Sequence, residues 1–180
     1  MKIITILCRG KLCGLLLLIF VFLPNLVVAS DYATGREAAI AGNYEGAISI
    51  WEKLVPKGNV LAMYSLAQIY QNGLGVLIDY EKARTFFHLA ALLEYPDAQY
   101  ALGAHYFSLV DGNFSENFGP ESILRMNIIK GYTWLSIAAK NGHTKAPELL
   151  NQIEGAGLPA HLVIEARRWA KNCEDHLVSC

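Results

Sequence analysis

One stretch of this chain occurs twice, and that repetition constrains the fold more than any other feature of the sequence. In the first half of each copy, a small residue is followed by Leu, a second small residue and Tyr: Ala62, Leu66, Ala67 and Tyr70, then Ala98, Leu102, Gly103 and Tyr106. The second halves, over residues 79–91 and 127–139, align in the same frame, and both end in two alanines. A repeated unit of this length indicates a solenoid, in which each unit covers the apolar side of the next.

The spacing of the small residues extends the repeat in both directions. Ala47 and Ala83 lie 36 residues apart, and so do Ala62 and Ala98. Ala98 and Ala146 lie 48 residues apart, so that a single insertion of twelve residues explains the longer interval. The repeat therefore accounts for most of the chain.

Apolar residues recur at the three- and four-residue spacing of a helix, and no window alternates with the period of a strand. The insertion, residues 110–126, holds the turn formers Asp111-Gly112-Asn113, so we expect a loop there, with room for one helical turn over 121–126. We predict an all-α fold of helix pairs over residues 33–41 with 44–56, 60–72 with 80–94, 97–109 with 127–141, and 144–155 with 159–176.

Residues at the expected helix ends agree with these boundaries. Asn43 and Asp79 stand where side chains that cap a helix N-terminus are needed. The pairs Asn72-Gly73 and Asn141-Gly142 are helix stop signals. Four large aromatic residues fall on one frame of the second helices, which favours a place in the core: Trp51, Phe86, Trp134 and Trp169.

Residues 62–91 read AMYSLAQIYQNGLGVLIDYEKARTFFHLAA, and with this pattern the chain resembles the Sel-1-like repeat family, relatives of the tetratricopeptide repeat. The copy over 98–139 is similar, with an expanded turn between its helices. The resemblance implies a right-handed α/α superhelix of three to four helix pairs over residues 30–180. It also implies a scaffold that mediates protein–protein interactions, commonly in the bacterial envelope.

The N-terminal segment has the features of a secretory signal. Lys2, Arg9 and Lys11 precede a short apolar run over 12–23, and small residues follow near Ala29. An apolar run of about a dozen residues is shorter than the roughly 20 that a membrane span needs. We therefore expect residues 1–29 to be a cleaved signal peptide, with no stable membrane insertion afterwards, and a periplasmic or secreted product. An uncleaved anchor is the alternative.

Charge and motifs exclude several classes of function. The chain has 15 basic and 16 acidic residues, and removal of residues 1–29 would take three bases and no acid, leaving a net charge of −4. That mild acidity gives no basis for binding nucleic acid. The five histidines show no paired metal-ligand spacing, and no nucleophile motif is present. We predict no catalytic residues, no metal and no cofactor. The alternatives are an envelope enzyme acting on the cell wall or on β-lactams, and an obligate structural subunit of an envelope complex.

Two cysteines remain after the predicted signal peptide, Cys173 and Cys180. In an oxidising compartment a disulfide between them is favoured. A continuous helix would separate them by about 10.5 Å along its axis, so the bridge requires the helix to stop near His176. Free thiols are one alternative. A metal site with His176 is another.

The first helices of the pairs are expected to line the concave face of the superhelix. The positions two and six residues after Ala62, Ala98 and Ala146, the small residues that begin the repeats, then point outward. Rigid aromatic side chains beside amides suit recognition of a peptide or a helix. The residues predicted to bind another protein on this basis are Tyr64, Gln68, Tyr100, Ala104, Glu148 and Gln152.

Overall fold

The structure is a computed structural model that describes residues 31–110 and 123–175. Every regular element in these two ranges is a helix, and neither range contains a strand, which confirms the predicted all-α class. A first helix covers residues 31–40. It is followed by α2 (Tyr44–Glu52), the short 3₁₀ helix η1 (Val55–Lys57), α3 (Val60–Asn72), α4 (Tyr80–Leu92), α5 (Pro96–Ser108), α6 (Ile123–Lys140), α7 (Ala146–Gly155) and α8 (Ala160–Asp175).

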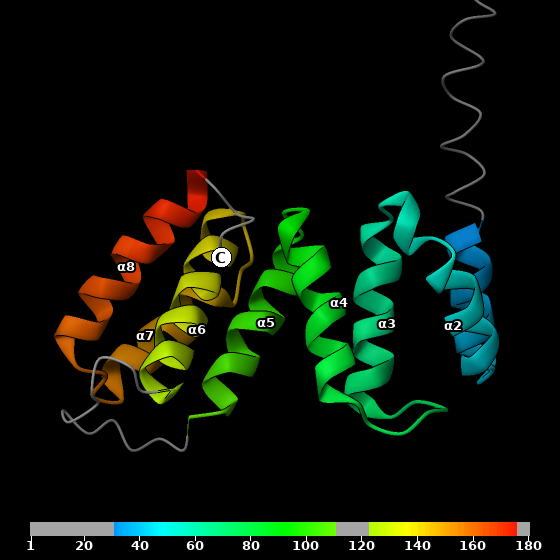
Figure 1. Ribbon diagram of the computed structural model, residues 1–180, viewed down its shortest axis with the longest axis horizontal. Helices are drawn as coiled ribbons and strands as arrows, with labels where there is room; N and C mark the ends of the chain where they lie inside the picture. The colour runs from blue at the N-terminus through cyan, green and yellow to red at the C-terminus, as the bar shows by residue number, and fades with distance from the viewer. Residues whose placement is uncertain (1–30, 111–122, 176–180) are drawn as a thin grey trace, which may run out of the picture.

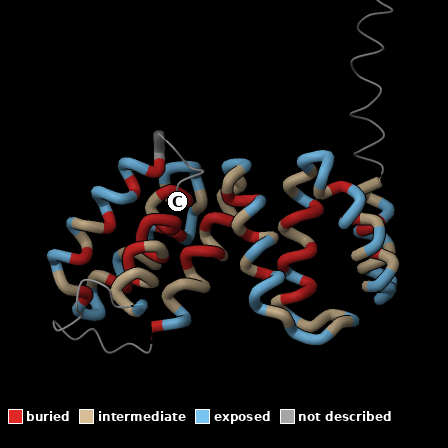
Figure 2. The backbone as a smooth tube through the Cα atoms, in the orientation of Figure 1, coloured by how far each residue is buried: buried red, intermediate tan, exposed pale blue. Residues whose placement is uncertain are grey.

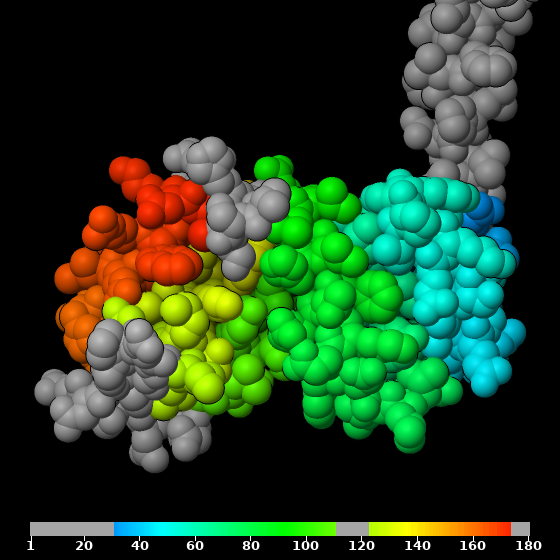
Figure 3. All heavy atoms as spheres, in the orientation of Figure 1, coloured from blue at the N-terminus to red at the C-terminus, as the bar shows by residue number. Residues whose placement is uncertain are grey.

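The helices stack side by side in chain order, as a solenoid requires (Figure 1). In the space-filling view the colours run in bands from the N-terminal helices at one end of the molecule to α8 at the other (Figure 3). From α2 to α6 each helix packs against the helices that precede and follow it, whereas α7 and α8 both pack mainly against α6.

Local capping explains where several helices begin and end. Asn43 Oδ1 accepts a hydrogen bond from the Gly46 backbone N–H at 2.9 Å, and Asp79 Oδ1 accepts one from Lys82 at 2.9 Å. Both predicted caps are therefore confirmed. Helix α3 ends at Gly73, whose φ of 65° lies in the left-handed region that favours glycine.

Buried side chains form two clusters that run through the stack (Figure 2). The larger includes Trp51, Leu66 and Trp134, and the smaller joins α6 to α7 and α8 through Ile128 and Leu162. Trp134 is only 1% exposed. Burial of each such side chain contributes about 1.5–3 kcal/mol. The stack is thus held by apolar contact between successive helices.

Helix α6 begins at Ile123, in agreement with the helical turn expected over 121–126, and Leu124 packs on the smaller core cluster. Two details differ from the sequence-based predictions. The predicted helix over 44–56 is interrupted after Glu52, and Pro56 lies in η1, because proline lacks the N–H that a helix interior needs. Trp169 is 37% exposed, because α8 is the last described helix and no further repeat covers its outer side.

Several predictions concern residues outside the described ranges. The signal peptide, residues 1–29, and most of the insertion lie there. Cys173 is 4% exposed and belongs to the larger core cluster, whereas Cys180 is not described, so their disulfide stays a prediction. In the part of the chain that the structure describes, no helix is long and apolar enough to cross a membrane.

Candidate functional site

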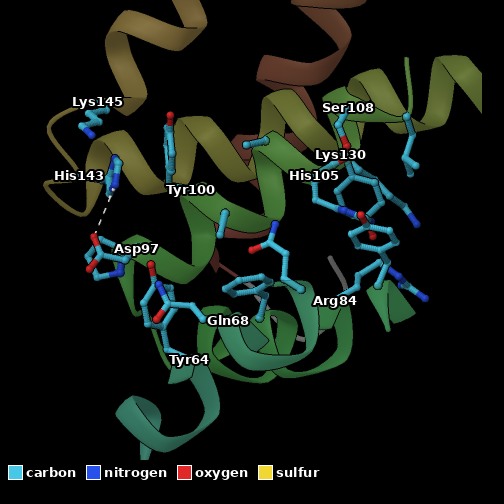
Figure 4. Close-up of a pocket in the computed structure, with 18 of the residues that line it drawn as sticks. Tyr64, Gln68, Arg84, Asp97, Tyr100, His105, Ser108, Lys130, His143 and Lys145 are labelled. Atoms are coloured by element: carbon cyan, nitrogen blue, oxygen red, sulfur yellow. Dashed lines mark hydrogen bonds and ion pairs between the residues drawn. The ribbon is translucent and has the colours of Figure 1, made fainter. Parts of the chain in front are cut away.

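A groove of about 1400 Å³ runs between the helices of the second and third pairs and the turn before α7. Figure 4 shows two ends, with Gln68 between them. Asp97, Tyr100, His143 and Lys145 lie toward one end, and Arg84, His105 and Lys130 lie toward the other. The side chains that line it come from α3, α4, α5, α6 and the 142–145 turn.

Helix α5 supplies the longest part of the lining. Pro96 and Tyr106 line the groove, and the other groove-lining residues of α5 recur at the spacing of a single helical face: Asp97, Tyr100, Ala101, Ala104, His105 and Ser108. The opposite face of the same helix is buried, with Leu102 fully inaccessible. Helix α5 is therefore fixed from behind by the core and presents one polar and aromatic stripe to the groove.

Four of the six residues predicted to bind a partner line this groove. Tyr64 and Gln68 reach it from α3, and Tyr100 and Ala104 reach it from α5. Glu148 and Gln152 do not line it. They are exposed on α7, beyond the turn that closes the groove, and Gln152 Nε2 donates to Glu148 Oε1 at 3.3 Å. The binding role of the four groove residues stays a prediction, and the groove gives no support for one at Glu148 and Gln152.

Tyr64 is held in place by two other rings. Its ring makes edge-on contacts with Phe87 and Tyr95, with centroid distances of 5.6 and 5.1 Å. Burial raises the pKa of Tyr64, and burial together with Asp97 raises the pKa of Tyr95 to about 12. Both phenols are therefore neutral at physiological pH, so each can donate as well as accept a hydrogen bond.

His143 forms one end of the groove. Its ring stacks on Tyr100 with centroids 4.1 Å apart, and its Nε2 lies 3.5 Å from Asp97 Oδ1. The turn that carries His143 is tied to α5 from behind: Asn141 Nδ2 donates to Gln99 Oε1 at 3.0 Å. Gln99 is fully buried and donates in turn to the Ala91 carbonyl at 3.1 Å. This chain of contacts fixes the end wall of the groove.

The other end of the groove is basic. Arg84 Nη2 donates to Glu81 Oε2 at 2.5 Å, and Lys130 Nζ lies 5.8 Å from the centre of the Tyr106 ring. Burial, followed by repulsion from Arg84, lowers the pKa of His105. Burial, followed by Arg84 and Lys130, lowers the pKa of His88. Arg84, His105 and Lys130 therefore lie together at this end of the groove.

Sequence reasoning missed this basic end and the contact between Asp97 and His143. The signal that could have found Asp97 and His105 is the helical period itself, because Asp97 lies one turn before Tyr100 and His105 lies one turn after Ala101 on the same face. No local signal connects Arg84 with Lys130, since they lie on different helix pairs.

This arrangement of side chains can bind a ligand, but the described residues form no metal site. No group of three or more His, Cys, Asp or Glu side chains within residues 31–110 and 123–175 is placed to hold a metal ion. The lining offers neutral phenols, amides, stacked rings and charges on a rigid helical wall. Such a surface suits a ligand long enough to contact several helices at once.

A stack of helix pairs with a groove across neighbouring pairs defines a helical-repeat protein of the solenoid class. Residues 60–95, 96–114 and 115–143 match the Sel1 repeat. The chain therefore carries Sel1 repeats over residues 60–143, as the resemblance of its sequence implies. The outer helix pairs, before residue 60 and after residue 143, lie outside the matched residues, and their place in the stack comes from the structure.

Solved structures show the same fold. The chain is similar to c5321, a protective antigen present in uropathogenic Escherichia coli strains that displays an SLR fold, with a TM-score of 0.65 and 20% identity. The match covers 81% of this chain and 29% of that one, so this chain spans less than a third of that protein. A Sel1 repeat protein from Oxalobacter formigenes matches with a TM-score of 0.54 and 23% identity over 69% of this chain and 88% of the other. A search of curated proteins finds no match.

Proposed function

We propose that this protein is an exported, non-catalytic scaffold of the bacterial envelope, and that it binds another protein or peptide in the groove between α3 and α5. Sel1 repeats generally mediate protein–protein interactions. The observation that carries the proposal is the stripe on α5, which exposes aromatic and polar side chains along one helical face while the opposite face is buried.

The size and the rigidity of the groove favour a segment of polypeptide as its ligand. Pockets for small molecules measure roughly 300–1,000 Å³, whereas this groove measures about 1400 Å³. Its walls are helices whose backs lie in the core, so little conformational entropy is lost in them when a ligand binds. Tyr64 and Tyr100 supply rigid rings, and Gln68 supplies an exposed amide between them.

The export part of the proposal is supported by the basic and apolar N-terminal residues and by the even number of cysteines beyond them. It is tested by expressing the full-length chain in a bacterium and determining the N-terminus and the cell fraction of the product. We expect an N-terminus near residue 30 and recovery from the periplasm or the medium. An intact N-terminus in the cytoplasmic fraction would contradict export.

Binding is tested with matched substitutions inside and outside the groove. The native protein is cross-linked in its own envelope, purified with its partner, and compared with Gln68→Ala, Tyr100→Ala and Gln152→Ala. Gln68 and Gln152 are both exposed glutamines on helices, but only Gln68 lines the groove. We expect both groove variants to lose cross-linked partner and the Gln152 variant to retain it. Equal recovery from all three folded variants would remove the groove as the binding site.

A further inference from the structure

The two ends of the groove differ in charge, and the basic end has fewer acids than bases. Arg84 and Lys130 both line it, and Glu81 is the acid that lines it beside them. The whole chain has a net charge of −1, and the part beyond residue 29 is more acidic still. A local excess of positive charge in an acidic protein points to a ligand of opposite sign.

Part of this positive charge is available to a ligand. The guanidinium of Arg84 has five N–H donors in a planar fork, of which one serves Glu81 and another serves Tyr106, and its side chain is 37% exposed. Among the described residues no ion pair joins Lys130 to an acid, and its ammonium lies over the Tyr106 ring. Arg84 and Lys130 can therefore approach one carboxylate from two helices.

Exposed apolar side chains lie on the helices that form this end: Tyr80 precedes Glu81 at the start of α4, Leu109 follows Ser108 after α5, and Ile123 starts α6 two turns before Lys130. Tyr80, Leu109 and Ile123 all line the groove, and their exposed fractions are 56%, 52% and 80%. Large apolar side chains exposed together on a soluble protein mark a surface that binds something. The basic end therefore combines two chemistries, cationic donors and apolar contact area.

We propose that this end of the groove recognises an acidic segment of the partner polypeptide, in which a carboxylate pairs with Arg84 and Lys130 and a neighbouring apolar side chain packs on Tyr80, Leu109 and Ile123. This inference rests on the proposed function and states the chemistry of the partner. Asp97, at the opposite end, is already paired with His143. The two ends therefore contact different parts of the same bound segment.

A polypeptide fits better than a nucleic acid. Nucleic acid binding relies on a track of Lys and Arg that follows successive phosphates. The groove instead holds Arg84 and Lys130 at one end and Lys145 at the other, with Glu81 and Asp97 among them. A peptide with one or two carboxylates beside a large apolar side chain matches this spacing of charge.

The inference is tested by panning a library of random twelve-residue peptides on the full-length protein as it is recovered from the expressing cells. We expect the selected peptides to be enriched in Asp or Glu next to a large apolar residue. The same panning on the double variant Arg84→Gln with Lys130→Gln is expected to lose that enrichment. Lys82→Gln is the control, because Lys82 lies on the same helix but faces the Tyr70 ring outside the groove.

Affinities give the second measurement. A selected peptide should bind the Arg84→Gln variant about tenfold more weakly than the wild type, because a charge-assisted hydrogen bond is lost. Replacing its acid by Gln or Asn should weaken binding to the wild type by a similar factor. Glu81→Gln should bind the peptide more tightly, since it removes the competing carboxylate.

The outcomes distinguish the proposal that the groove binds a polypeptide from the proposal that its basic end recognises an acidic segment. Selected peptides without acidic enrichment, or with the same enrichment on the double variant, would overturn this inference and leave groove binding in place. Failure to select any peptide on folded protein would overturn both. A twelve-nucleotide single-stranded DNA that binds as tightly as the best peptide, with the same loss in Arg84→Gln, would overturn the choice of a polypeptide.

Discussion

Gly103 on α5 and Gly131 on α6 face each other where the two helices cross, and neither position has room for a side chain. A Cβ atom on Gly103 would lie 3.0 Å from the Gly131 carbonyl oxygen and 2.8 Å from Leu135 Cγ. A Cβ atom on Gly131 would lie 3.1 Å from the Gly103 carbonyl oxygen and 2.7 Å from a ring carbon of Phe107. The close approach of this helix pair therefore depends on both glycines.

We expect Gly103→Ala and Gly131→Ala each to destabilise the protein, by about 1–3 kcal/mol, because the backbones must move apart to admit a methyl group. Alanine is the better helix former by about 1 kcal/mol, so the clash has to outweigh that gain. The measurement is urea unfolding followed by circular dichroism. Gly155→Ala, at the end of α7 with nothing within 4 Å of the added carbon, is the control and should not destabilise. Stabilisation in all three variants would show that the helices tolerate separation here.

The buried amide of Gln99 gives a second prediction. Gln99→Met keeps the length of the side chain but leaves the Ala91 carbonyl and the Asn141 amide without their partner. An unsatisfied buried polar group costs about 1–3 kcal/mol, and we expect a loss of this size in the free energy of unfolding. Gln152→Met on the exposed face of α7 should be nearly neutral. A neutral Gln99→Met would mean that water or a rearranged Asn141 replaces the lost bonds.

Stability should also depend on pH through two histidines. Burial and nearby positive charge hold the pKa values of His88 and His105 below their ordinary value of 6.5. The unfolded chain therefore takes up protons at a higher pH than the folded chain does. Stability is full above pH 6.5 and falls as the pH drops below that value. Burial and Arg84 act on both histidines; Lys130 adds to the shift of His88, whereas Glu81 opposes that of His105.

The prediction is a Tm that decreases between pH 7.5 and pH 5.5, measured by differential scanning calorimetry. In the double variant His88→Gln with His105→Gln the decrease should be smaller. His161→Gln serves as the control, since His161 lies exposed on α8, away from this cluster. A wild-type Tm that stays constant over this range would contradict the lowered pKa values.

The predicted disulfide between Cys173 and Cys180 can be tested by intact mass. If Cys173 and Cys180 are bridged, the protein should gain the mass of two hydrogens on reduction. Closing so short a loop contributes about 2 kcal/mol in the chain-entropy description, so reduction should also lower the Tm. Cys180→Ser should reproduce the reduced Tm under oxidising conditions. An unchanged mass on reduction would establish that no bridge is present.

Much of the fold could be predicted because its determinants are local. Helix periodicity, the caps at Asn43 and Asp79 and the left-handed Gly73 act within a few residues of sequence. The repeat then indicated that the helices stack. An error arose where packing overrode the local pattern: Trp169 is exposed because no further repeat among the described residues covers it.

The groove could be predicted only in part. Tyr64 and Tyr100 follow from the repeat, because equivalent places on successive first helices share a face. Arg84, Lys130 and His143 do not occupy equivalent places in the repeat. Arg84 and Lys130 meet at one end of the groove and His143 lies at the other because α4, α6 and the 142–145 turn all pack against α5. No spacing within the sequence expresses that packing.

The sequence by itself determined the helix pairs, their order and the residues that join one pair to the next, since 3.6-residue periodicity and capping are properties of short segments. Only the tertiary structure decided that Asn141 meets Gln99, that His143 meets Asp97, and that the two ends of the groove differ in charge. These contacts depend on the angles at which helices pack. Those angles are set jointly by every side chain between the helices, including the paired glycines at 103 and 131.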